Sequence, residues 1–160
     1  MPIVHVECLP DEALVKLLGI SRRMVYHHGG KSRVFSRLKT VTGEVAMVDE
    51  DPGSIKTEYE TGLEFIQESY GIRLYNDERN NKILILKIKL EDWILGACKT
   101  SNVDITRFGF FKTKCLTWSN KSKTIRFRKI NQSFEGKRKP KHYSIKGILK
   151  LIGHTNYNLI

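Results

Sequence analysis

The sequence predicts an α/β protein with a mostly parallel sheet flanked by helices, and three observations support this fold class. Short apolar runs alternate with segments of helical periodicity through the first fifty of the 160 residues. One of these runs, residues 45–48, is continuously apolar and ends in three acids and a Pro-Gly turn, which is typical of a buried parallel strand. Hydrophobic residues make up 40% of the chain, which is enough for a packed core.

The first elements expected are a strand at residues 3–7 and a helix that begins near Pro10. Asp11 suits the positive end of that helix, and Gly19 suits its C-terminal cap.

A second strand is expected at residues 22–28, and the Gly29-Gly30 turn then leads into a helix with an apolar face. Strands and helices that alternate in this way predict a parallel sheet with right-handed crossovers.

The central strand runs directly into Asp49-Glu50-Asp51. Because strand side chains alternate, Asp49 and Asp51 are expected on one side and Glu50 on the other. Open α/β sheets form ligand sites at this end of their strands, and two carboxylates can share a hard cation such as Mg²⁺. A solvated acidic turn is the competing interpretation.

Beyond the Pro52-Gly53 turn, residues 55–70 have the spacing of a helix. Strands are expected at 72–75 and 82–88, a helix from Leu90, and a closing amphipathic helix over residues 145–152.

Charge divides the chain into two parts. Residues 1–80 carry a net charge of −3, whereas residues 81–160 carry +14. We therefore expect an α/β core at residues 1–104 and a basic C-terminal segment at residues 105–160 that packs on the same core. An acidic site beside a basic surface is typical of proteins that process polyanions, and a basic, solubilising surface is the alternative.

Three widely spaced cysteines argue against a disulfide framework and favour a cytoplasmic protein. No apolar run approaches the ~18 residues of a membrane span, and the start lacks the features of a signal peptide.

Two acidic motifs resemble those of Toprim domains, which occur in topoisomerases, primases and the ribonuclease and OLD-type nuclease branches. Glu7-Cys8-Leu9-Pro10-Asp11 keeps both acids of the first motif, with Cys8 where the family usually has glycine. Asp49-Glu50-Asp51 matches the second motif. The resemblance covers roughly the first 90 residues and implies a Toprim-like, Rossmann-like fold.

The resemblance also implies Mg²⁺- or Mn²⁺-dependent cleavage of a nucleic-acid backbone. Glu7 would be a general acid/base or a metal ligand, and Asp49 and Asp51 would be metal ligands. Glu91, which follows the last apolar strand, is a further candidate ligand, although an acid in the first turn of a helix also suits the helix dipole.

Candidate phosphate-binding residues fall into two groups. Lys31 follows two glycines at a strand-to-helix turn; the segment does not match a Walker A motif, and a plain turn capped by Ser32 is the alternative. Residues 105–150 hold 14 Lys/Arg and one acid, interleaved with aromatics. There the candidates are Lys137, Arg138, Lys139 and Lys141.

The hypothesis from the sequence is a cytoplasmic, Mg²⁺-dependent nuclease or catalytic subunit that acts on DNA or RNA, with no membrane partner. A homodimer or a larger protein complex is compatible with it. Two alternatives stay open. One is a non-catalytic nucleic-acid-binding module or subunit of a larger defence or repair complex, and the other is a small phosphotransfer or phosphohydrolase domain.

The charge distribution generates a prediction about binding. Replacing Lys137, Arg138 and Lys139 with Glu should weaken nucleic-acid binding and flatten its dependence on salt, because fewer counterions are released. A titration of a labelled oligonucleotide from low to moderate salt measures both effects. If wild-type affinity does not fall with salt, the basic segment is only a solvated surface.

Overall fold

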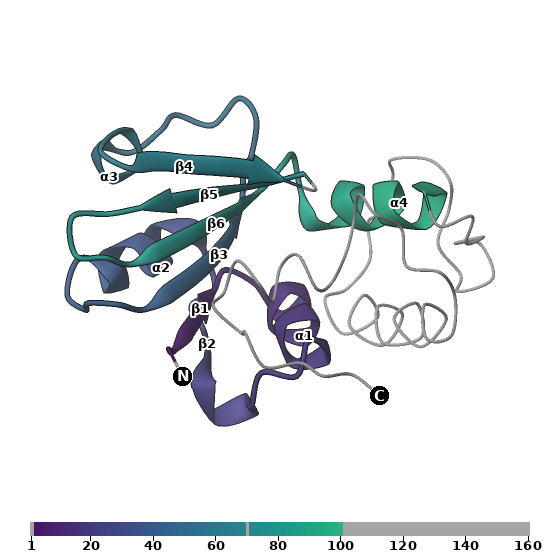
Figure 1. Cartoon of the computed structure of the whole chain (residues 1–160), viewed down its shortest axis with the longest axis horizontal. Coiled ribbons are helices and arrows are strands. Elements are labelled where there is room, and N and C mark those ends of the chain that lie inside the picture. Colours follow the sequence, from purple (N-terminus) through teal and green to yellow (C-terminus); the bar gives the residue numbers. More distant parts are fainter. Residues whose placement is uncertain (1, 70, 101–160) are drawn as a thin grey trace.

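The computed structural model describes residues 2–69 and 71–100, which form a six-stranded sheet flanked by helices (Figure 1). The expected closing helix and the basic segment lie outside the described residues. In chain order the elements are β1 (Val4–Val6), α1 (Leu9–Leu17), a 3₁₀ turn (Arg22–Met24), β2 (Val25–His27), α2 (Lys31–Leu38), β3 (Val45–Asp49), α3 (Glu58–Thr61), β4 (Glu64–Ser69), β5 (Ile72–Asn76), β6 (Lys82–Leu86) and α4 (Leu90–Thr100).

The sheet has the strand order β2-β1-β3-β6-β5-β4. Strands β2, β1, β3 and β6 are parallel, while β5 and β4 add an antiparallel edge. The expected α/β class with a mostly parallel sheet is therefore confirmed. Because β3 lies between β1 and β6, the acids that follow it are placed near the middle of one sheet edge.

Helices cover the two faces of the sheet, as alternating strands and helices require. On one face, α1 and α4 pack on β1, β3, β5 and β6 through a large apolar cluster that includes Val15, Met47 and the buried Trp93. On the other face, Phe35 and Leu38 of α2 pack on the middle strands. Both faces are covered, so the parallel strands can be continuously apolar.

The helix expected over residues 55–70 is wrong. Only α3 is helical there: Thr57 caps its first turn and Gly62 ends it. The helical spacing of Tyr59 and Leu63 reflects how these two side chains pack against the α2 cluster. The following residues form β4, whose backbone pairs with β5 in an antiparallel hairpin.

Two strand boundaries also differ from the expectation. Residues 22–24 form a 3₁₀ turn, so β2 begins only at Val25. At the other end, β6 stops at Leu86, because Ile88 has a positive φ of 70° that an extended strand does not allow.

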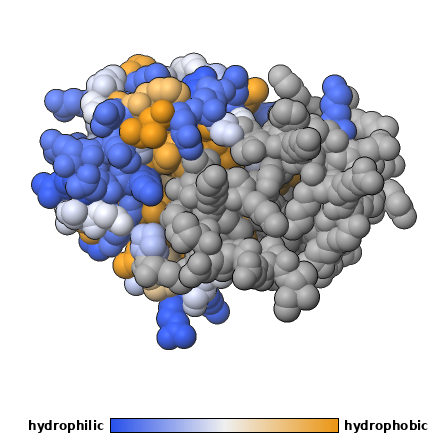
Figure 2. Space-filling view, in the orientation of Figure 1, coloured by the Kyte–Doolittle hydropathy of each residue, from blue (hydrophilic) through white to orange (hydrophobic). Residues whose placement is uncertain are grey.

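Strand β4 is the outer strand of the antiparallel edge and is largely exposed. Phe65 and Ile66 are 54% and 44% exposed. In the surface view, apolar side chains lie among hydrophilic ones near the top, where β4 runs (Figure 2). The pairing with β5 shifts register between Phe65 and Gln67, which marks a bulge.

Within residues 2–69 and 71–100, no helix combines the length and the apolar character needed to cross a membrane.

Asn81 ties the loop before β6 to the rest of the domain. Its side chain is fully buried and donates to the carbonyls of Leu38 and Val41 (3.0 and 3.1 Å) and to a carboxylate oxygen of Asp77 (2.8 Å). Its amide oxygen accepts from the backbone N–H of Glu44 (2.9 Å). All of the polar atoms of this side chain are therefore satisfied.

We predict that Asn81→Ala lowers the free energy of unfolding by about 3 kcal/mol, because it leaves several buried partners unsatisfied. Chemical denaturation measures the change. Asn80→Gly is the control: Asn80 is exposed with a φ of 58°, a conformation that glycine adopts freely, so stability should change little. Equal losses in both variants would contradict the role given to Asn81.

Candidate functional site at the carboxyl edge of the parallel strands

Glu7 and Asp49 lie at the same edge of the sheet, as the sequence predicts. Glu7 directly follows β1, Asp49 ends β3, and these two strands are parallel neighbours. The Glu7 carboxylate accepts from the backbone N–H of Asp49 at 3.4 Å. The parallel pairing therefore brings together two acids that are 42 residues apart in the sequence.

Two further acids reach this edge from the helices. Asp11 lies in the first turn of α1 and Glu91 in the first turn of α4. The charges of Glu7, Asp11 and Glu91 all act on Asp49. We refer to Glu7, Asp11, Asp49 and Glu91 as the acid cluster.

Burial raises the pKa values of Asp49, Asp11 and Glu7, and the negative charges of neighbouring acids raise them further. Burial, followed by the charges of Asp11, Glu7 and Glu91, raises the pKa of Asp49 to about 8. Burial is also the main cause that raises the pKa of Asp11 to about 6. Burial likewise raises the pKa of Glu7, although the hydrogen bond from the N–H of Asp49 acts in the opposite direction. An added cation would relieve this repulsion.

Asp11 is the most deeply buried acid of the cluster, with no exposed surface. Its Oδ2 accepts from the backbone N–H of Cys8 at 2.9 Å, which closes the first turn of α1. Its Oδ1 has no hydrogen-bond partner among the described residues. A buried carboxylate oxygen without a partner, beside other acids, has the chemistry of a ligand for a hard cation.

In the described part of the chain, no three His, Cys, Asp or Glu side chains are arranged closely enough to hold a metal ion. The donor set fits Mg²⁺ in its chemistry, since every member is a carboxylate.

The Asp49-Glu50-Asp51 segment is bound to the connection between β6 and α4. Asp49 Oδ1 accepts from the backbone N–H of Leu90 (2.9 Å), and a Glu50 carboxylate oxygen accepts from that of Ile88 (3.0 Å). The N–H of Asp51 donates to the carbonyl of Ile88 (3.2 Å). This acidic clamp fixes the start of α4, and with it Glu91, against the end of β3.

The expected alternation of the three acids rests on strand geometry, which the structure shows only as far as Asp49. The strand ends at Asp49, and Asp51 has a φ of 47°, so strand geometry no longer decides where its side chain points. Asp51 lies 3.7 Å from the Lys89 ammonium, and its charge still contributes to raising the pKa of Glu7 after the larger effect of burial. It therefore lies near the acid cluster, on its solvent side, because about a third of its side chain is exposed.

Lys31 reaches the same edge but is already paired. Its ammonium lies 2.9 Å from a Glu60 carboxylate oxygen and donates to the carbonyl of Glu50 at 3.2 Å. Its side chain is 13% exposed, and its charge acts on Glu7. In this arrangement Lys31 holds α3 and the acidic clamp together, so a phosphate would have to compete with Glu60.

The remaining candidates, Lys137, Arg138, Lys139 and Lys141, lie outside the described residues. Sequence reasoning missed Asp11 as a member of the site, although its spacing from Glu7 in the first motif was a usable signal.

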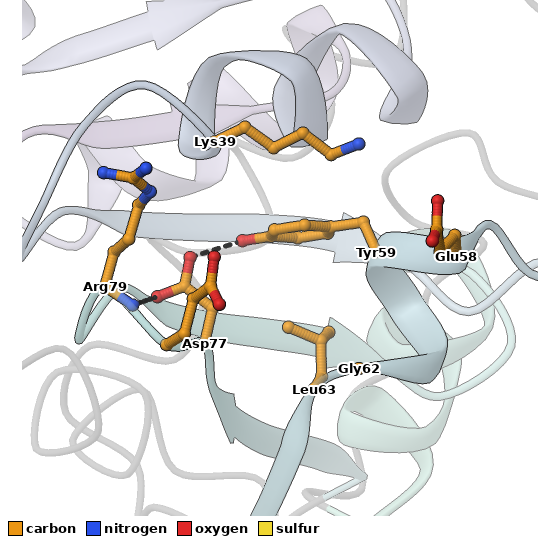
Figure 3. A pocket seen from close by; sticks show the side chains of 8 residues that line it. Lys39, Glu58, Tyr59, Gly62, Leu63, Asp77 and Arg79 are labelled. Atoms are coloured by element: carbon orange, nitrogen blue, oxygen red, sulfur yellow. Dashed lines mark hydrogen bonds between the residues drawn. The ribbon is translucent and has the colours of Figure 1, made fainter.

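A cavity of about 450 Å³ lies at the opposite edge of the sheet, between α2, α3 and the loop that precedes β6 (Figure 3). Tyr59 donates to Asp77 in its wall at 2.7 Å, and Lys39 and Arg79 are the cations that line it. Figure 3 shows the Lys39 side chain above the Tyr59 ring, to whose centroid its ammonium lies 6.0 Å, and Arg79 at the end where the tyrosine hydroxyl meets Asp77. None of the residues that line this cavity belongs to the acid cluster, so the two do not form one site.

Comparison of the chain with protein-family models, with curated proteins and with solved structures found no match. The functional argument therefore rests on the geometry and chemistry of the acid cluster.

The raised pKa of Asp49 predicts how stability depends on pH. In the unfolded chain Asp49 loses its proton near its ordinary pKa of 3.8, but in the folded protein only near 8. Between these values the unfolded state binds fewer protons, so ionisation of Asp49 lowers stability as the pH rises. Asp49→Asn removes this loss and keeps an oxygen to accept from Leu90.

With divalent ions chelated, Asp49→Asn should therefore gain stability relative to wild type from about pH 5 to about pH 8. Denaturant titrations across this range measure the difference. Asp77→Asn is the control. Burial raises the pKa of Asp77, but hydrogen bonds from Tyr59 and Asn81 outweigh burial, so the pKa lies below its ordinary value. The effect of Asp77→Asn on stability should therefore be constant over this pH range. A difference for Asp49→Asn that does not vary with pH would contradict the described electrostatics.

Proposed function

We propose that this protein is a Toprim-like, Mg²⁺-dependent nuclease, or the catalytic subunit of one, that hydrolyses the phosphodiester backbone of DNA or RNA in the cytoplasm. The observation that carries the proposal is the acid cluster at the carboxyl edge of β1 and β3, with a buried oxygen of Asp11 that has no hydrogen-bond partner within residues 2–69 and 71–100. The two acidic motifs of the sequence meet there, in the order and strand context that the resemblance to Toprim domains implies.

The cluster can perform two tasks in such a reaction. Asp49, with Asp11, Asp51 and Glu91 nearby, would supply one or two carboxylate ligands to Mg²⁺ or Mn²⁺. Water and substrate oxygens would complete the coordination, since no three acids of the described residues are arranged closely enough to hold the ion by themselves. When bound, such an ion orients a phosphodiester and stabilises the charge on its oxygens. Glu7 lies on the α2 side of the cluster and has a raised pKa through burial, which suits a group that accepts a proton from the attacking water.

Exposure indicates one side from which the substrate can approach. Asp11 is fully buried in the first turn of α1, whereas Asp51 and Lys89 are partly exposed, so the side that bears these two residues is open to a strand. Lys89 is 56% exposed and is bound only loosely to Asp51, which leaves its charge accessible to a phosphate.

A second candidate function is a non-catalytic nucleic-acid-binding module that keeps the fold. The acidic clamp favours it, because Asp49 and Glu50 have structural partners in the backbone at Leu90 and Ile88 and so have a role without any metal. In that case the acids would maintain the start of α4 and the basic segment would supply the affinity.

Cleavage by variants distinguishes the two functions. Asp49→Asn should cut Mg²⁺-dependent turnover by roughly a hundredfold or more, because losing a ligand removes several kcal/mol of transition-state stabilisation. Nucleic-acid affinity should be unchanged or slightly higher, since a repulsive carboxylate is removed. Labelled single- and double-stranded DNA and RNA, with Mg²⁺, Mn²⁺ or chelator, give the readout.

Asp92→Asn is the matched control, because Asp92 lies beside Glu91 in the first turn of α4 but is not among the charges that chiefly raise the pKa of Asp49. Its turnover should equal that of wild type. Full activity in an Asp49→Asn/Asp51→Asn double variant would refute the assignment. A wild type that cleaves no substrate with either metal would support the binding module instead.

A further inference from the structure

Two hydrogen bonds link His28, His5 and Glu44 across neighbouring strands of the sheet, beside the acid cluster. His5, in the middle of β1, is 1% exposed. Its Nε2 is hydrogen-bonded to a Glu44 carboxylate oxygen, and its Nδ1 lies 2.8 Å from Nε2 of His28. A buried imidazole is costly unless both nitrogens are paired, and here both are.

Glu44 decides which nitrogen of each ring carries the proton. A carboxylate only accepts hydrogen bonds, so Nε2 of His5 carries a hydrogen and Nδ1 of a neutral His5 accepts. Nε2 of His28 must then be the donor, which leaves Nδ1 of His28 as the free position. Within the described residues, that atom has no hydrogen-bond partner. The chain from Glu44 through His5 thus fixes the orientation of a half-buried histidine.

The surroundings of His28 are positively charged. Arg33 donates to the backbone carbonyl of His28 at 3.4 Å and passes over Gly29, where a Cβ would lie 3.5 Å from its guanidinium. Burial, followed by the charges of His5, Arg37 and His27, lowers the pKa of His28. The one acid in this chain of contacts, Glu44, lies beyond His5 and is already bonded to it.

Arg33 and Arg37 are four residues apart in α2, so they lie on the same face of the helix. Both are exposed, α2 contains no acid, and neither arginine belongs to an ion pair in the described part of the chain. By contrast, Lys31, Arg73, Lys87 and Lys89 all have carboxylate partners. Other cations of the described residues, Lys39 and Arg79 among them, are also outside ion pairs, but Arg33 and Arg37 are the two that lie beside His28.

This group lies close to the acid cluster. His28 follows β2, and its N–H donates to the carbonyl of Val6 at 3.1 Å, one residue before Glu7. The same turn leads through Gly29 and Gly30 into the first residue of α2, whose charge acts on Glu7. A nucleic-acid strand with one phosphate at the acid cluster would have a neighbouring phosphate within reach of this turn.

We propose that His28, Arg33 and Arg37 form a second phosphate subsite that holds the nucleic-acid backbone next to the acid cluster, with His5 and Glu44 as positioning residues. Arg33 and Arg37 supply charge-assisted hydrogen bonds to phosphate oxygens. His28 gains a proton on Nδ1 when the phosphate binds and donates from that atom, while Nε2 keeps its bond to His5. The inference rests on the proposed function only in taking the ligand to be a nucleic acid.

Binding without cleavage tests the subsite. A fluorescein-labelled oligothymidylate is titrated by fluorescence anisotropy in the presence of chelator, which excludes hydrolysis. Arg33→Gln/Arg37→Gln should weaken binding by roughly tenfold at low salt and reduce the slope of log K against log salt by about 1.4, since each lost contact to a single strand contributes about 0.7. Arg79→Gln, an exposed arginine at the opposite sheet edge, is the matched control and should keep both values.

The role of His28 is tested separately, by the pH dependence of binding and by NMR. Wild-type affinity should rise as the pH falls through the pKa of His28, and His28→Gln should remove this dependence. Nitrogen NMR of labelled histidines should show His28 with its proton on Nε2 in the free protein and a second proton on binding. Glu44→Gln, which keeps the size of the side chain, should disturb that tautomer.

The outcomes separate this inference from the proposed function. Equal affinity and salt slope in the double-arginine variant and the Arg79 control would overturn the subsite, whether or not the protein cleaves. An unchanged His28 tautomer in Glu44→Gln would overturn the positioning role. If the arginines matter for binding but no metal supports cleavage, the subsite stands and the nuclease proposal fails.

Discussion

The parallel pairing of β3 with both β1 and β6 is the constraint on which the site depends. It brings Glu7 and Asp49 to one edge, and it places the end of β6 where Glu50 and Asp49 can bind the backbone of Ile88 and Leu90. These hydrogen bonds therefore fix the position at which helix α4 starts. The same carboxylates that define the candidate site also determine the direction in which the chain continues toward its basic segment.

This double role leaves the edge electrostatically unbalanced. A structural cap needs one acceptor at the start of α4, whereas four acids gather there, and burial together with the charges of neighbouring acids raises the pKa values of Asp49 and Asp11. Among the cations that the structure describes, Lys31 is bound to Glu60 and Lys89 is mostly exposed, so these two do not fully compensate the acids. An excess of buried negative charge that the fold does not require is typical of a site where charge is supplied by a ligand.

Secondary structure could be predicted correctly where the sequence has one dominant pattern, and not where two patterns compete. The continuous apolar run of β3 could only be a buried strand, and it located Asp49 correctly. Residues 58–69 combine helical spacing at Tyr59 and Leu63 with a strand that forms only because β5 is available as a partner. Likewise, the hydrogen bonds between Glu44, His5 and His28 depend on strand register, so they could not be derived from spacing along the sequence.

The outer strands also limit how these molecules can meet one another. β2 has only three residues, and β4, although longer, is interrupted by a bulge and carries Glu64 and Glu68. A bulge breaks the regular row of N–H and C=O groups that a second strand would need, and acids facing acids repel. The apolar Phe65 and Ile66 are therefore displayed on an edge that resists continuous strand pairing, which protects a chain with exposed β-structure from growing into fibrils.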